Sequence, residues 1–260
     1  MKPSIFIGLP NLGKLNTNLA RRLRDWYHSE KYAITQAEAS GLYPLELAVN
    51  RLLSFFLESD CDWLFLINAD ECVPLDTLDR FIAHDVDVVA PLGLRWSTLK
   101  GPLPCVGVKE GGEDGFARHF ENPEGVEEIA GRPRYIQPTS GYKGLLKCDR
   151  IGNSAMLLKR KVVEAIPLGS FRLEMSEDRC EVYGSEDFVW CDAIRAAGFQ
   201  IWVDCDVLLN HYKEVDLSTV TRLQLEARER GRGDVVRALR RLLEAGVTPA
   251  DAIEGVEEYV

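Results

Sequence analysis

The feature that most restricts the fold of this chain is a run of five apolar residues, 63–67, followed at once by polar and acidic ones. The run shows none of the alternation expected of a strand with one face in water, so it predicts a strand buried on both faces, as in a parallel sheet. Asn68 to Glu71 would then stand at the carboxyl end of that strand. In open α/β sheets, ligands bind outside that end.

Similar runs come before and after this one. Residues 4–9 and 86–90 are apolar and β-rich, and each is followed by a proline, Pro10 and Pro91, which we expect to end the strand. Apolar residues recur at helical spacing between these runs, at Leu15, Leu19, Leu23 and Trp26, at Leu45, Val49, Leu52, Leu53 and Phe56, and at Leu75, Leu78 and Phe81. The resulting order β-α-(α)-β-α-β predicts an α/β fold with an open, mostly parallel sheet flanked by helices.

Regular patterns return in the second half of the chain. Residues 151–158 are largely apolar, and a helix is expected from about residue 185 to a C-cap at Gly198. Residues 200–203 predict a further strand, and His211 follows soon after it. These segments would belong to the same domain as the first half.

The chain is expected to have a main domain, residues 1–213, and a C-terminal helical extension, residues 214–260. Within the main domain, residues 93–144 lose periodicity and are rich in Gly, Pro and charge, which indicates a variable insert that is functional or mobile. The extension repeats Leu, Arg, Glu and Ala at helical spacing, and we expect it to pack beside the sheet or against another copy of the chain.

Composition excludes several classes of protein. The 260 residues include 31 Lys and Arg against 41 Asp and Glu, a formal charge of −10, which disfavours a general nucleic-acid coat protein. No apolar run approaches the roughly 20 residues that span a bilayer. The seven cysteines are scattered without a C-x-x-C pair, which favours reduced thiols in a cytoplasmic protein over disulfides or a zinc finger.

The strongest chemical signal is the pair Asn68 and Asp70, whose side chains can point to the same side of an extended chain. Oxygen ligands of this kind suit Mg²⁺ or Mn²⁺ holding a diphosphate. An Asx turn that starts the next helix would explain the same pair without any ligand.

Two later features have functional and structural explanations that both stay open. Glu186 and Asp187 open a helix, where acids can serve the helix dipole alone, or one of them can act as a general base. His211 can be structural, or its imidazole can complete a metal site begun by Asp70.

In this order, the motifs resemble those of the GT-A glycosyltransferases, especially the broad family 2-like group. The resemblance covers residues 4–212, with 93–144 unmatched. Four segments carry it: WLFLINADECVP at 63–74, which is similar to a strand running into a D-x-D motif, YPLELAVNRLL at 43–53, GNSAMLLKR at 152–160 and SEDFVWCDAIRAAGFQIWVD at 185–204. The resemblance implies a GT-A (Rossmann-like) fold and transfer of a sugar, with inversion, from a UDP- or GDP-sugar to an acceptor that the sequence does not identify.

The resemblance also implies roles for particular residues. Asp70 and His211 would bind Mn²⁺ or Mg²⁺, Asp187 would be the catalytic base, and Glu186 would hold the donor sugar or the acceptor. Leu9, Pro10 and Asn11 would contact the nucleobase and ribose of the donor, with Arg51 nearby. Asn68, Ala69 and Asp70 would also bind the donor.

The chain departs from the family pattern at Asn68, which replaces the first acid of D-x-D. As a direct ligand, an uncharged amide would weaken metal binding. The departure leaves open an inactive nucleotide-binding module. A nucleotidyltransferase of related fold is a further alternative, although Gly8 to Lys14 is too sparse in glycine and lysine for a P-loop.

Overall fold

The computed structural model describes residues 2–11, 13–97, 101–104, 106–109, 135–136, 143–176 and 182–212. The chain divides into two compact units, residues 1–93 with 104–210, and residues 94–103 with 211–260. The helices predicted for 214–260 and most of the insert predicted at 93–144 lie outside the described residues, so both stay predictions.

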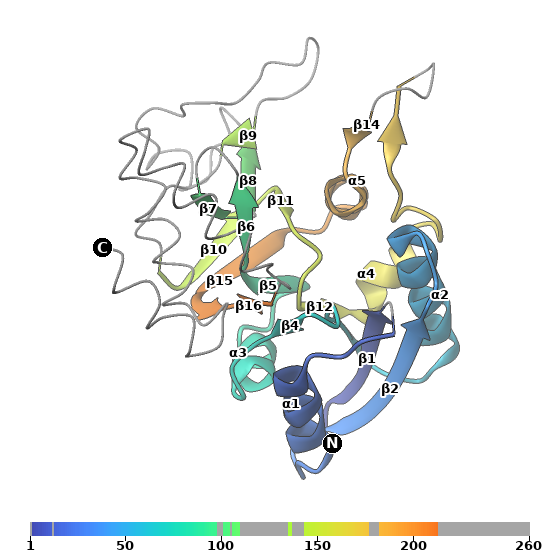
Figure 1. Cartoon of the computed structure of the whole chain (residues 1–260), viewed down its shortest axis with the longest axis vertical. Coiled ribbons are helices and arrows are strands. Elements are labelled where there is room, and N and C mark those ends of the chain that lie inside the picture. Colours follow the sequence, from blue (N-terminus) through green and yellow to red (C-terminus); the bar gives the residue numbers. More distant parts are fainter. Residues whose placement is uncertain are drawn as a thin grey trace, which may run out of the picture. The chain divides into compact units, whose positions relative to one another are not determined.

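The first unit is built on a seven-stranded sheet (Figure 1). Its strands, in spatial order, are β10 (Leu145–Cys148), β15 (Ile201–Leu208), β5 (Val88–Leu92), β12 (Met156–Lys159), β3 (Trp63–Leu66), β1 (Ser4–Asn11) and β2 (Ala33–Ser40). The pairing directions show that five strands run the same way, and β12 and β10 run against them. The prediction of an open, mostly parallel sheet is confirmed.

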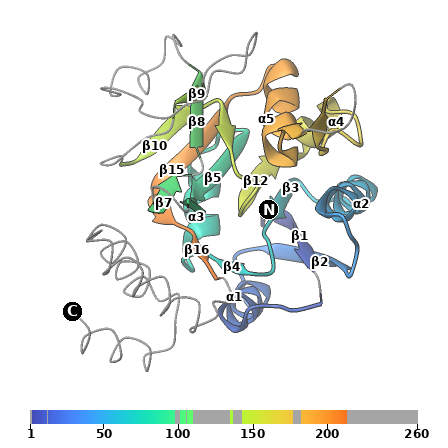
Figure 2. The same cartoon turned by 45° about the horizontal axis from the view of Figure 1, so that its top comes forward.

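Helices cover both faces of this sheet (Figures 1 and 2). They are α1 (Thr17–Tyr27), α2 (Leu45–Glu58), α3 (Thr77–Ala83), α4 (Arg160–Ala165) and α5 (Glu186–Ala196). Buried residues of α1 and α3 share one hydrophobic cluster, and those of α2, α4 and α5 share the other. Within β3, Leu64 and Leu66 belong to one cluster and Phe65 to the other, as a strand buried on both faces requires.

The shorter strands form separate sheets of two or three strands. They are β4 (Glu71–Cys72), β6 (Leu94–Ser97), β7 (Gly101–Pro104), β8 (Val106–Lys109), β9 (Tyr135–Ile136), β11 (Arg150–Ile151), β13 (Glu174–Met175), β14 (Val182–Gly184) and β16 (Asn210–His211). Of these, β4 pairs with β16, and β8 lies between β11 and β9. The β4–β16 pair carries the candidate site described below.

Strand β2 was not predicted from the sequence, where it appears as a polar stretch. It pairs only with β1, at the edge of the sheet, and most of its side chains are exposed or half-buried. An edge strand with little buried surface carries too few apolar residues to show a period.

The two prolines expected to end strands do not do so: β1 continues through Pro10 to Asn11, and β5 continues through Pro91 to Leu92. In β1, pairing with β3 stops at Gly8, so Pro10 has only β2 beside it. Pairing of β5 with β12 likewise stops before Pro91. A proline is tolerated where its missing N–H would face no ladder partner.

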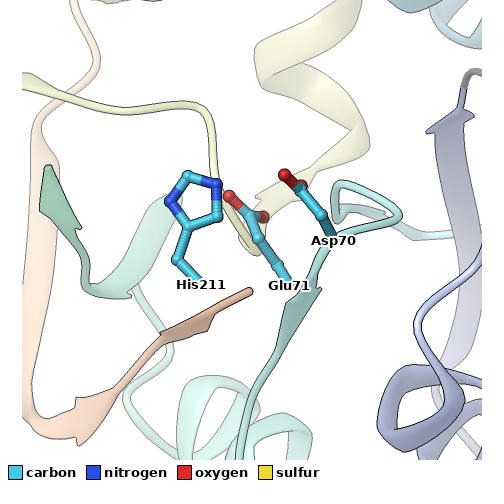
Figure 3. Close-up of side chains that lie close together, drawn as sticks. All are labelled: Asp70, Glu71 and His211. Carbon is cyan, nitrogen blue, oxygen red and sulfur yellow. The ribbon is translucent and has the colours of Figure 1, made fainter. Parts of the chain in front are cut away.

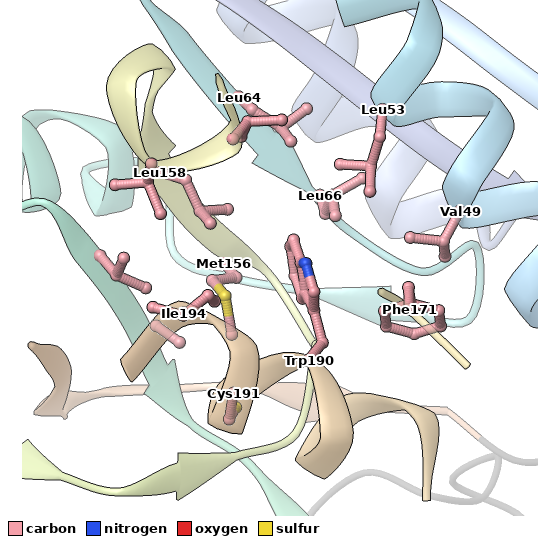
Figure 4. Packing of buried hydrophobic residues seen from close by; sticks show 14 of the residues in the cluster. Val49, Leu53, Leu64, Leu66, Met156, Leu158, Phe171, Trp190, Cys191 and Ile194 are labelled. Atoms are coloured by element: carbon pink, nitrogen blue, oxygen red, sulfur yellow. The ribbon is translucent and has the colours of Figure 1, made fainter. Parts of the chain in front are cut away.

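Helix α5 is seated deeply on its face of the sheet. Figure 4 shows Trp190 among side chains of α2, β3 and the segment around Phe171. Trp190 is 1% exposed, and its ring meets that of Phe171 edge to face, with centroids 5.6 Å apart. This packing fixes the helix that begins with Glu186 and Asp187. No helix in the described part of the chain is both long and apolar enough to cross a membrane.

Candidate metal centre

Residues 68–71 form a tight turn just after β3. The N–H of Glu71 donates to the carbonyl of Asn68 at 3.1 Å. The carbonyl of Ala69 accepts from the N–H of Asn16 at 2.8 Å, and the Asn16 side chain caps the start of α1. The turn is therefore fixed by its own hydrogen bond and by the first turn of a neighbouring helix.

Two further hydrogen bonds join Asn68 to Glu71. The Asn68 N–H donates to Oε2 of Glu71, and Nδ2 of Asn68 donates to Oε1, both at 3.1 Å. Glu71 is fully buried, so these bonds replace part of the hydration that its carboxylate loses. Asn68 acts here as a donor to a neighbouring acid.

His211 reaches this turn through the pairing of β16 with β4. The division between the two units falls within β16, between Asn210 and His211. Asp70, Glu71 and His211 each offer a ligand atom, and these three atoms all lie within 4.8 Å of one another. Figure 3 shows Glu71 at the start of β4, Asp70 just before it and His211 on the adjoining strand.

Two carboxylates and an imidazole are a donor set that fits a divalent cation such as Mn²⁺. Asp70 and His211 are half-buried, whereas Glu71 is buried. The structure thus brings together the two residues predicted as metal ligands, which are 141 positions apart in the chain. That they bind a metal stays a prediction.

Glu71 was not predicted as a ligand. The sequence prediction treated residues 68–71 as an extended chain, in which alternate side chains point to opposite sides. Glu71 would then point away from Asn68 and Asp70. The turn ends that alternation and brings Glu71 beside Asp70. The available signal was the N-x-x-E spacing across a turn, which allows an amide to bond an acid three positions later.

The acids predicted for catalysis, Glu186 and Asp187, occupy the first turn of α5. Oδ1 of Asp187 accepts a hydrogen bond from the Ser185 hydroxyl and another, at 2.8 Å, from the N–H of Phe188. Burial raises the pKa of Asp187 above its usual value, although both hydrogen bonds act in the opposite direction. The carboxyl group therefore holds a proton more readily than an exposed aspartate.

Glu186 is affected in the same direction. Burial raises its pKa, and the negative charges of Asp187 and of Glu46, in the first turn of α2, add to the effect. Two acids with raised pKa values are typical of a site that moves protons.

Helix α5 is also tied to β11 directly. The guanidinium of Arg150 forms an ion pair with Asp192, with Nε 3.0 Å from Oδ1. The Cys191 thiol donates to the carbonyl of Ile151 at 3.3 Å. These contacts lie within two turns of Asp187 and hold the position of its backbone.

The residues predicted to meet the nucleobase and ribose lie at the end of β1. The Leu9 side chain is fully buried in the core, and Pro10 is buried as well, so Leu9 can offer a ligand only its backbone. Oδ1 of Asn11 accepts from the N–H of Gly13 at 2.7 Å, which holds the loop after the strand.

Arg51 was predicted to lie near the donor. It is exposed on α2, and its guanidinium carbon lies 4.7 Å from the centre of the Phe55 ring. This contact is with a residue of the same helix and does not connect Arg51 to the turn at 68–71, so its role in donor binding stays a prediction.

Comparison with known proteins shows the fold. No family model and no curated protein matches the sequence. Among solved structures, A197 from STIV aligns over 82% of this chain and 86% of its own, with 15% identity and a TM-score of 0.51.

Two other solved structures are more distant. GalNAc-T7 with UDP, GalNAc and Mn²⁺ aligns over 83% of this chain and 45% of its own, with 10% identity and a TM-score of 0.45. S. aureus TarS 1–349 with UDP-GlcNAc aligns over 83% and 60%, with 12% identity and a TM-score of 0.36. Because these scores are low, only A197 supports a conclusion, and that conclusion concerns the fold. The chain has an α/β fold of the GT-A-like type: a mostly parallel, mixed, seven-stranded sheet between two layers of helices.

Proposed function

We propose that this chain is a divalent-metal-dependent glycosyltransferase that moves a sugar from a nucleoside diphosphate sugar to an acceptor hydroxyl, with inversion at the anomeric carbon. The observation that carries the proposal is the convergence of Asp70, Glu71 and His211 beside the end of β3. The carboxyl ends of parallel strands are where open α/β sheets bind ligands.

Asp70, Glu71 and His211 would hold Mn²⁺ or Mg²⁺. Such a cation, when bound, stabilises the negative charge that develops on the departing diphosphate. Asn11, Asn68 and the backbone around Leu9 would bind the nucleoside part of the donor, as the resemblance to GT-A enzymes suggests.

Asp187 would act as the general base. A carboxylate whose pKa is raised by burial accepts a proton from a hydroxyl more readily than an ordinary aspartate does. The acceptor hydroxyl would pass its proton to Asp187 as its oxygen attacks the anomeric carbon. On the opposite side, the bond between the anomeric carbon and the diphosphate oxygen would break, and the nucleoside diphosphate would leave. Glu186, one residue away, would position the donor sugar or the acceptor.

The first experiment screens nucleotide-sugars in the presence and absence of Mn²⁺ by thermal shift, because a ligand that binds the folded state raises the melting temperature. The full chain is then assayed for release of nucleoside diphosphate from the best donor. NMR of the product reports its anomeric configuration. We expect metal-dependent stabilisation by at least one UDP- or GDP-sugar.

Variants assign the roles. Asp70→Ala and His211→Ala should weaken metal-dependent donor binding. Asp187→Asn should keep that binding and lose turnover by about 10²–10⁴-fold, the usual contribution of a general base. Asp60→Asn is the matched control, because Asp60 is exposed before the opposite end of β3. Unchanged turnover in Asp187→Asn would remove Asp187 as the base.

Two results would contradict the proposal itself. Metal-dependent binding of a nucleoside diphosphate without turnover against a broad acceptor set would indicate a binding module. Release of pyrophosphate from a nucleoside triphosphate would indicate a nucleotidyltransferase.

A further inference from the structure

We infer that Asn68 is a positioning residue, which acts on the metal centre by holding Glu71 in place as the third metal ligand. The inference rests on the proposed function, since it concerns the same centre. It reverses the simplest interpretation of the sequence, in which the amide is a weakened form of the first D-x-D acid.

The hydrogen bonds from Asn68 to Glu71 support this role. The backbone N–H and the side-chain Nδ2 of Asn68 reach different oxygens of Glu71, each at 3.1 Å. An ionised carboxylate can only accept hydrogen bonds, so the amide must turn its NH₂ group, and not its oxygen, towards Glu71. Nδ2 of Asn68 is thereby committed to the acid.

Burial explains why Glu71 needs such a partner. Glu71 is fully buried, and burying an ionised carboxylate costs free energy unless the carboxylate accepts hydrogen bonds. A carboxylate has about four acceptor directions, so the two bonds from Asn68 fix its orientation and leave capacity for other partners. Hydrogen bonds of this kind orient metal ligands in general.

The variant Asn68→Asp distinguishes the two roles, because they predict opposite changes in metal affinity. As a direct ligand, the new carboxylate would add a negative charge to the metal site and tighten binding. In the positioning role, Asn68→Asp replaces the side-chain donor with an acceptor and sets a second carboxylate against Glu71. We therefore expect the variant that restores the D-x-D pattern to bind metal more weakly than the natural chain.

The experiment titrates the full chain with Mn²⁺ alone and follows free Mn²⁺ by electron paramagnetic resonance. It compares the natural chain with Asn68→Asp, Asn68→Ala, Glu71→Gln and the double variant Asn68→Ala/Glu71→Gln. The control is Gln36→Glu, which adds one negative charge on the exposed face of β2. Thermal melting without metal shows whether each variant is folded.

We expect Asn68→Asp and Asn68→Ala to bind Mn²⁺ about 10–100-fold more weakly, as loss of an outer hydrogen bond to a ligand usually does. Gln36→Glu should bind as the natural chain does. In the Glu71→Gln background, Asn68→Ala should cost nothing further, because its effect passes through Glu71. This comparison tests the inference even where Asn68→Asp fails to fold.

Two outcomes would overturn the inference alone: Mn²⁺ binding in Asn68→Asp as tight as in the natural chain or tighter, or additive losses in the double variant. In both cases the metal centre and the proposed function would stand. A natural chain that takes up no Mn²⁺ would overturn both together.

Discussion

Arg80 on α3 holds both carboxylate oxygens of Asp204, a fully buried residue of β15 and a neighbour of Pro91 in the sheet. Nε and Nη2 of Arg80 lie 3.1–3.2 Å from these oxygens. His84 adds a contact of 2.8 Å between its Nε2 and Oδ2 of Asp204. This ion cluster connects one helix layer with the strand that leads towards His211.

Removal of Arg80 should destabilise the fold substantially. Arg80→Ala leaves a buried carboxylate with a weaker set of partners. We expect a loss of about 2 kcal/mol, less than for a fully buried pair, because the Arg80 side chain is partly exposed and His84 remains. Urea unfolding at pH 7 measures it. Arg24→Ala is the control, since Arg24 pairs with Asp25 on the exposed surface and such pairs contribute little. Equal effects of the two substitutions would contradict the buried role of Asp204.

The contribution of Asp204 should also depend on pH. Burial raises its pKa, but the hydrogen bonds from His84, the Asp206 N–H and Arg80 outweigh burial, and the pKa lies below its usual value. The unfolded chain then takes up the proton at a higher pH than the folded one. The stabilisation is fully present above the ordinary aspartate pKa of about 3.9 and is lost as the pH falls through the folded-state pKa.

Asp204→Asn provides the check on this pH dependence. Its stability deficit against the natural chain should be largest near pH 7 and should shrink below about pH 4. Unfolding free energies at several pH values measure the deficit. A deficit that stays constant into acid would show that the charge of Asp204 contributes nothing.

Ser185→Ala should change the pH profile of the proposed reaction. The Ser185 hydroxyl donates to Asp187 and lowers the pKa of that acid, against the dominant effect of burial. Without the hydroxyl the pKa rises further, so a base at Asp187 becomes ionised only at higher pH. The acidic limb of kcat, measured by nucleoside diphosphate release, should move to higher pH.

Ser54→Ala is the matched control for this experiment, because Ser54 donates to Glu58 within α2 in a similar serine–carboxylate contact. It should leave the profile in place. An unmoved profile in Ser185→Ala as well would indicate that Asp187 serves only the start of the helix.

Thr77→Val should stabilise the protein. Thr77 is fully buried at the start of α3, and its hydroxyl has no hydrogen-bond partner in the described part of the chain. Valine keeps the shape and removes the cost of burying a hydroxyl, so we expect a gain of about 1 kcal/mol in the free energy of unfolding. Thermal and urea unfolding measure it. Thr77→Ser, which keeps the hydroxyl, should give no gain, and a loss in Thr77→Val would show that the hydroxyl is bonded.

Local patterns were sufficient for much of the fold. The strand at 63–67, predicted from an unbroken apolar run, is β3, and the apolar spacing around Leu19 and Leu52 marks α1 and α2. Burial imposes these periods residue by residue, so they can be detected in the sequence. Strand β2 could not be found in this way, because at the sheet edge its side chains face mostly solvent.

The candidate site was only partly accessible to such patterns. Asp70 could be singled out because it follows a strand, and Glu186 because it begins a helix. The pairing of Glu71 with Asn68 depends on a turn of the backbone, which no periodicity describes. Its proximity to His211 depends on the pairing of two short strands.

The amino-acid sequence by itself determined the alternation of strands and helices, the mostly parallel sheet and the acids at its carboxyl edge, because each is written in the local pattern of apolar and polar residues. Tertiary structure alone decided that Glu71 joins Asp70 and His211 and that Asn68 donates hydrogen bonds to Glu71. Contacts between residues far apart in the chain leave no periodic pattern in the sequence, because they form only when distant strands pair in the folded protein.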